Sequence, residues 1–91
     1  MKKISAQHIL VQHQYEAEDL LRALKDGKDF TDLARKHSKC PSASEGGNLG
    51  SFPRGKMDED FEEAAFALKV GDITAKPVRT KFGYHLIKRT A

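Results

Sequence analysis

Four side chains from three separate parts of this sequence have the chemistry of a catalytic or binding site: His8, Cys40, Thr80 and His85. Two imidazoles side by side in a protein interior would hydrogen-bond to each other, and a nearby thiol and hydroxyl could extend the network. Taken singly, each histidine is also explained without a function, as a core residue whose hydrogen bonds are satisfied.

Two other kinds of chemistry would use some of the same residues. Cys40 and a histidine could form a nucleophile–base pair, but this pair needs an activated thiol and an oxyanion hole, and the sequence around Cys40 carries no thiol-hydrolase signature. His37 and Cys40, with His8 or His85, could bind a metal, but the chain has no second cysteine and the spacing alone is weak. We therefore expect neither a metal nor a cofactor.

A set of apolar side chains follows Cys40: Leu49, Phe52, Met57 and Phe61. Each of them is explained by default as part of the core. Met57 and Phe61 are four residues apart, so they would share one face of a helix that begins at Met57, whereas Phe66 would point elsewhere. This helix would therefore have one face for the core and another that lines a cleft.

The segment from 40 to 66 organises the rest of the chain. Gly46 and Gly47 are poor helix residues, and with the short apolar strand that follows they predict a backbone that bends tightly and crosses another segment. A turn over 53–56 then leads into the helix that begins at Met57 and ends before Gly71.

The hydrophobic periodicity predicts the remaining elements. Residues 3–11 alternate as a strand with apolar residues on both sides, which indicates a central strand carrying His8. The elements expected, in order, are a strand over 3–11, helices over 14–26 and 30–38, a turn-rich segment over 40–48, a strand over 49–52, a helix over 57–70, an edge strand over 73–78 interrupted by Pro77, a turn over 79–83 and a strand over 84–88. This order predicts an α+β domain with a largely antiparallel sheet.

Length and composition limit the class of protein. Ninety-one residues predict a single domain over 1–91, and no apolar run is long enough for a membrane span or a signal segment. The single cysteine fits a reducing compartment, so we expect a cytoplasmic location. The net charge of +3 is spread along the chain rather than clustered, which argues against nucleic-acid binding.

Several motifs together resemble the parvulin family of peptidyl-prolyl cis/trans isomerases, and the small stand-alone microbial parvulins most of all. They are Ser5-Ala6-Gln7-His8-Ile9-Leu10-Val11, Phe30-x-x-Leu33-Ala34-x-x-x-Ser38, Gly46-Gly47-Asn48-Leu49-Gly50-x-Phe52, Arg54-Gly55-Lys56-Met57-x-x-x-Phe61-Glu62-x-Ala64-x-Phe66, and Thr80-x-Phe82-Gly83-Tyr84-His85-Leu86-Ile87. The resemblance covers nearly the whole chain, in order and spacing. It implies a four-stranded antiparallel sheet wrapped by helices, the FKBP-like architecture, in the order β-α-α-(loop or short helix)-β-α-β-β.

The resemblance also implies roles for the site residues. His8 and His85 correspond to the paired strand histidines, Cys40 to a polar loop residue that is Asp in many relatives, and Thr80 to a hydroxyl beside the histidines. The pocket that holds the substrate proline is formed by Leu49, Met57 and Phe61.

The implied function is non-covalent rotation of X-Pro bonds in peptides and in unfolded or partly folded proteins, by a monomer that assists folding. Phosphorylated substrates are not required, since 12–16 lacks the Lys and Arg cluster of the phosphate-directed branch. The turn cations Arg54, Lys56, Arg79 and Lys81 could give a mild tolerance for Glu before proline, with small or apolar residues preferred. The alternative is a non-catalytic chaperone, or a ribosome- or nucleic-acid-associated module, on the same fold.

Overall fold

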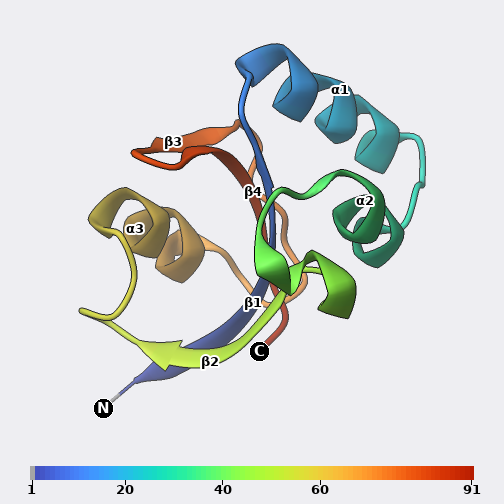
Figure 1. The fold of residues 1–91 in the computed structure, drawn as a ribbon. Helices are drawn as coiled ribbons and strands as arrows, with labels where there is room; N and C mark the ends of the chain where they lie inside the picture. Colours follow the sequence, from blue (N-terminus) through green and yellow to red (C-terminus); the bar gives the residue numbers. More distant parts are fainter. Residues whose placement is uncertain (1) are drawn as a thin grey trace.

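Four strands form one antiparallel sheet in the order β2-β1-β4-β3 (Figure 1). The computed structural model describes residues 2–91. The strands are β1 (Lys3–Val11), β2 (Asn48–Pro53), β3 (Val78–Thr80) and β4 (Gly83–Arg89). The first and last strands are therefore neighbours at the centre, which confirms the central position predicted for 3–11 and brings the two histidine-bearing strands together.

The helices cover the sheet on both faces, with α1 and α2 on one side and α3 on the other (Figure 1). They are α1 (Gln14–Lys25), α2 (Phe30–His37), the short 3₁₀ helix η1 (Pro41–Glu45) and α3 (Glu59–Ala67). Alternation along β1 divides the core: Ile4 and Ala6 pack with α3, whereas Ile9 and Val11 pack with α1 and α2. The element order and the α+β class agree with the sequence prediction.

Local sequence explains the first two helices. Ala17 and Leu20 are the buried residues of α1, one turn apart on its inner face. Asp29 caps α2, because its carboxylate accepts a hydrogen bond from the backbone N–H of Asp32 at 3.2 Å. His37, the last residue of α2, is exposed.

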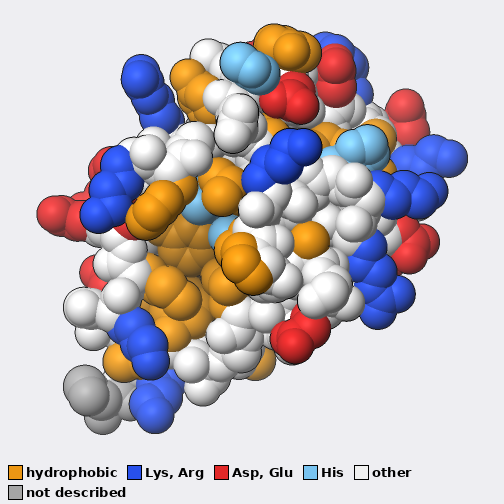
Figure 2. Space-filling view, in the orientation of Figure 1, with side chains coloured by type: hydrophobic (Ala, Val, Ile, Leu, Met, Phe, Trp, Pro, Cys, Tyr) orange, Lys and Arg blue, Asp and Glu red, His pale blue; other side chains and the backbone are white. Residues whose placement is uncertain are grey.

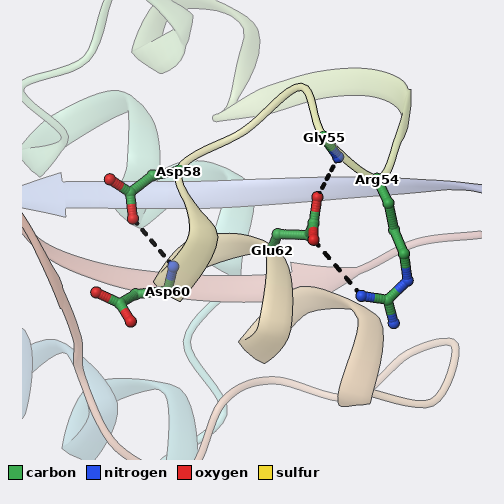
Figure 3. Close-up of polar contacts among 5 residues, drawn as sticks. All are labelled: Arg54, Gly55, Asp58, Asp60 and Glu62. Carbon is green, nitrogen blue, oxygen red and sulfur yellow. Dashed lines mark hydrogen bonds and ion pairs between the residues drawn. The ribbon is translucent and has the colours of Figure 1, made fainter.

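The third helix begins two residues later than the sequence predicts. The side chain of Asp58 accepts a hydrogen bond from the backbone N–H of Asp60 at 3.0 Å, so Asp58 is the N-cap and the helix begins at Glu59 (Figure 3). Met57 lies in the preceding loop, so the prediction that it shares a helix face with Phe61 is wrong. The helix also ends early, at Ala67, where Arg89 Nη1 donates to the carbonyl of Leu68 at 2.7 Å.

The predicted edge strand over 73–78 is also wrong. In this segment Ile73 makes an isolated pairing with Lys88, and the edge strand β3 occupies Val78–Thr80, in what was expected to be a turn. Pro77 lacks an N–H and cannot donate to the ladder, which explains why regular pairing with β4 begins only after it. Within residues 2–91, none of the helices has the length and apolar character needed to cross a membrane.

Candidate functional site

The two strand histidines lie side by side on the α3 face of the sheet. The strand register places Leu10 opposite His85 and His8 opposite Ile87, so the histidines are diagonal neighbours. Their Nδ1 atoms are 3.0 Å apart, their ring planes are 18° from parallel, and each residue is only 5% exposed. The predicted hydrogen bond between His8 and His85 is therefore confirmed.

Two hydroxyl groups end this network. Thr80 Oγ1 is 2.8 Å from His85 Nε2, and Ser42 Oγ is 3.3 Å from His8 Nε2. Each ring nitrogen of the pair therefore has a partner. Thr80 extends the network as predicted. Among the described residues, the Cys40 thiol makes no hydrogen bond to this network. The hydroxyl at the His8 end belongs to Ser42. Sequence reasoning missed Ser42, although it lies in the turn-rich segment over 40–48.

Backbone hydrogen bonds to β1 position Cys40 and Ser42. The segment that carries them is joined to β1 at both ends, by Lys39 N–H to the Leu10 carbonyl at 2.7 Å and by His8 N–H to the Gly47 carbonyl at 2.9 Å. Gly47 has a φ of +81°, and a Cβ there would come within 2.2 Å of the His8 carbonyl oxygen. This is the tight crossing that the paired glycines predict.

Burial keeps the two imidazoles neutral at neutral pH. Desolvation, with a smaller contribution from repulsion by His85, lowers the pKa of His8 to about 4. Desolvation also lowers the pKa of His85, while the negative charge of Asp58 acts in the opposite direction. The pair is therefore a neutral, hydrogen-bonded platform.

An apolar pocket of about 360 Å³ lies over this platform. Figure 2 shows it as a hollow on this face, with hydrophobic side chains around it and histidine at its floor. The Phe61 ring meets both imidazoles edge-on, with centroids 5.6 Å from His8 and 5.2 Å from His85. The lining residues are His8, Leu10, Lys39, Cys40, Pro41, Leu49, Met57, Asp58, Phe61, Phe82 and His85.

This lining includes every residue predicted for the site except Thr80, which hydrogen-bonds to His85. The residues that sequence reasoning missed are Leu10, Lys39, Pro41, Asp58 and Phe82. Two of them had a usable sequence signal: Asp58 stands at the start of a helical segment, and Phe82 lies in the turn next to Thr80.

The cations expected beside the pocket do not line it. Arg54 lies over the Phe66 ring at 4.4 Å and pairs with Glu62, whereas Arg79 and Lys81 line a separate groove between α3 and β3. Lys56 lines neither cavity. The mild tolerance for Glu was expected from these four cations, and none of them lines the pocket.

One carboxylate holds the loop that carries Met57. Glu62 of α3 accepts a hydrogen bond from the backbone N–H of Gly55 through Oε1, and its Oε2 is 3.5 Å from Arg54 Nη1 (Figure 3). The Glu62 side chain is 14% exposed, so this contact is partly shielded from water. The loop between β2 and α3 is thus fastened to the helix on which Phe61 lies.

The metal and nucleophile hypotheses gain no support from this geometry. His37 lies at a different small cavity, with Val11 and Glu16, so it does not join Cys40 at one site. No cluster of three or more His, Cys, Asp or Glu side chains within 2–91 is arranged to hold a metal ion. No hydrogen bond joins the Cys40 thiol to an imidazole within this range, so the arrangement lacks the base that a nucleophilic thiol needs.

Comparisons with known proteins agree with this site. Residues 6–91 match the family model described as Rotamase, the PPIC-type PPIase domain. The chain is 51% identical over 89 residues to the foldase protein PrsA of Bacillus subtilis (strain 168), covering 97% of this chain but 30% of that protein. The chain thus spans about a third of the length of such curated relatives.

Solved structures give the same result. The crystal structure of PrsA from Bacillus subtilis matches 98% of this chain and 35% of its own, with a TM-score of 0.94 and 50% identity. The solution structure of NmPin, the parvulin of Nitrosopumilus maritimus, matches all of this chain and 98% of its own, with a TM-score of 0.88 and 44% identity. The second match is to a protein whose length is close to that of this chain.

Proposed function

Because the chain belongs to the family of PPIC-type peptidyl-prolyl isomerase (rotamase) domains, and is thus an isomerase domain of the parvulin type, we propose that an X-Pro bond rotates in the pocket above His8 and His85. The observation that carries this proposal is an apolar pocket whose polar floor has no free ring nitrogen. Such a site can bind a proline ring and favour a twisted amide without proton transfer.

The reaction needs only preferential binding of the twisted bond. Amide resonance sets a rotation barrier of about 18–20 kcal/mol, and an X-Pro bond exchanges over tens of seconds or more. Rotation removes this resonance, so the twisted amide is less polar than the planar one. An apolar environment therefore disfavours the planar ground state. Each ~1.4 kcal/mol of preferential stabilisation gives about tenfold in rate.

Each part of the pocket has a role in this mechanism. Leu49, Met57 and Phe61 hold the proline ring, and Cys40, which also lines the pocket, adjusts the electrostatics near the substrate carbonyl. His8 and His85 fix the geometry of the floor. Thr80 holds His85 in orientation from behind, so it is a positioning residue.

The substrates in this proposal are proline-containing peptides and unfolded or partly folded proteins, and the activity assists their folding. The name foldase is that of the PrsA relatives, and this chain covers 30% of the length of the first of them. Action on folding clients is therefore part of the proposal. We also propose that residues 1–91 form one domain, act as a monomer and work in the cytoplasm; the last point rests on the single cysteine. Light scattering would test the monomer, and cell fractionation the location.

Phosphorylated substrates are not required. A phosphate before proline needs two or three converging Lys or Arg side chains, because it carries nearly two negative charges at neutral pH. Lys39 is the cation in the pocket lining, and Asp58 in the same lining opposes an anion. A preference of a hundredfold for phospho-Ser-Pro over Ser-Pro, about 2.7 kcal/mol, would contradict this part of the proposal.

A spectroscopic isomerisation assay on an Ala-Pro tetrapeptide, with and without the chain, tests the function. We expect catalytic acceleration that saturates with peptide concentration. If the chain binds unfolded protein but leaves the exchange rate unchanged, the non-catalytic chaperone is the correct alternative. Binding to RNA or ribosomes without acceleration would support the nucleic-acid-associated module instead.

A further inference from the structure

The lining of the proline pocket includes two charged side chains of opposite sign, Asp58 and Lys39. The two differ in their surroundings. Lys39 is exposed, so water and salt weaken its interaction with a substrate. Asp58 is half-buried beside the apolar lining, where a charge acts more strongly.

The Asp58 carboxylate uses one of its two oxygens to cap α3. Its Oδ1 accepts the hydrogen bond from the Asp60 N–H that caps α3 (Figure 3). Within residues 2–91 the other oxygen, Oδ2, accepts no hydrogen bond. Ser, Thr or Asn would cap a helix about as well as Asp, so the cap alone does not require a negative charge at this position.

The start of α3 does not neutralise this charge. The helix dipole supplies about half a positive charge at its N-terminus. Asp58, Glu59 and Asp60 are three successive acidic residues there, and the first turn has no basic residue. The charge of Asp58 also reaches the pocket floor, because it raises the pKa of His85 against the effect of burial.

We propose that Asp58 is a specificity-determining residue that makes the pocket favour peptides with Lys or Arg next to proline over peptides with Asp or Glu. This inference rests on the proposed isomerase function. It reverses the mild tolerance for Glu expected from the sequence, since the cations behind that expectation do not line the pocket and Asp58 does.

The test measures a ratio within each protein variant. Exchange NMR gives kcat/KM for matched tetrapeptides that carry Lys, Glu or Ala immediately before proline, and for a second series with these residues immediately after it. We expect the wild-type chain to prefer Lys over Glu in at least one series, and Asp58→Asn to reduce that ratio about fivefold, or about 1 kcal/mol. Asn keeps the helix cap and removes only the charge.

Asp60→Asn is the matched control. It removes the same charge from the first turn of the same helix, but Asp60 lines the separate groove and not the proline pocket. We expect its Lys-to-Glu ratio to equal that of the wild type. The wild-type ratio should also fall as salt rises from about 0.05 to about 1 M, because salt still screens a half-buried charge. Over this range the Debye length falls from above about 10 Å to about 3 Å.

The outcomes separate this inference from the proposed function. An unchanged ratio in Asp58→Asn, or an equal fall in Asp58→Asn and Asp60→Asn, overturns the role of Asp58, while acceleration of the Ala peptide keeps the isomerase proposal. No acceleration of any peptide by the wild type overturns both. If Asp58→Asn does not fold, Asp58→Ser, which also caps a helix, gives the same comparison.

Discussion

Phe61 belongs both to the hydrophobic core and to the pocket. It is 4% exposed and packs with Phe52 and Ala65, while its ring also meets both imidazoles. Phe61→Leu should therefore cost about 1–2 kcal/mol of unfolding free energy and also lower kcat/KM per folded molecule, by about tenfold. Chemical denaturation and a prolyl isomerisation assay measure the two effects separately.

Phe66 on the same helix provides the control. It is 8% exposed, packs in the same core cluster and does not line the pocket. Phe66→Leu should lose similar stability without loss of activity per folded molecule. Equal activity in the two variants would show that Phe61 is a core residue only.

We predict that Cys40 contributes polarity to the pocket lining and forms no covalent intermediate. We expect Cys40→Asp to keep substantial isomerase activity and Cys40→Ala to reduce it, because the position needs a polar group and not a nucleophile. Kinetics of both variants, with mass spectrometry of the wild type during turnover, check this. A substrate-derived thioester on Cys40 would contradict the non-covalent mechanism.

At the level of structural elements, the Glu62 side chain of α3 holds the loop between β2 and α3. Glu62 accepts a hydrogen bond from the Gly55 N–H and pairs with Arg54, so it holds the loop from which Met57 lines the pocket. Glu62→Ala should raise KM about fivefold and cost about 1–2 kcal/mol of stability. Most of that loss comes from the backbone hydrogen bond, because Arg54 is exposed and its ion pair is weak.

Glu63 is the matched control, since it is adjacent, exposed and outside the pocket. Glu63→Ala should leave KM within twofold of the wild type, a difference of about 0.4 kcal/mol or less. Glu62→Gln should lie between the two, because its amide oxygen can still accept from Gly55. An unchanged KM in Glu62→Ala would show that the loop is held in other ways.

Elements with clear periodicity could be predicted from the sequence, and elements fixed by single side chains could not. Residues 3–11 and 14–26 correspond closely to β1 and α1, because alternation and helical spacing each have one consistent solution there. The start of α3 and the position of β3 depend on the Asp58 cap and on Pro77. Both effects move a boundary without changing the hydrophobic pattern.

The same distinction applies to the site. The histidines, Leu49 and Phe61 lie on or beside regular elements, so their meeting followed from the strand order and from the family resemblance. Ser42 and Phe82 come from segments whose path is set by tertiary contacts, such as the close approach of Gly47 to β1. Sequence spacing carries no direct information about such contacts.

For the whole molecule, the buried histidine pair makes stability depend on pH. The pKa of His8 is lowered to about 4 in the folded chain, against about 6.5 when unfolded, so the unfolded state binds a proton first as pH falls. The stabilisation is therefore present above about pH 6.5 and is lost as pH falls towards 4, on the order of 3 kcal/mol. His85, whose pKa is also lowered, acts in the same direction.

Denaturant unfolding at several pH values between 8 and 4, together with NMR titration of the imidazole protons, measures this effect. The His8 ring signal should stay constant from pH 8 to about 5 while the chain remains folded. Titration of His8 near its usual pKa in the folded chain, or equal stability at both ends of the range, would contradict the neutral pair. An activity change that follows this titration would instead indicate acid–base catalysis.

We propose that the pocket above the histidine pair binds proline and accelerates its isomerisation. Exchange NMR on an Ala-Pro tetrapeptide mixed with the isotope-labelled chain reports the cis–trans rate and the contacts of the proline ring in one sample. We expect faster exchange, together with intermolecular contacts from the proline ring to the Met57 methyl group and the Phe61 ring. Unchanged exchange, or proline contacts only in the groove at Ala64 and Val78, would contradict this proposal.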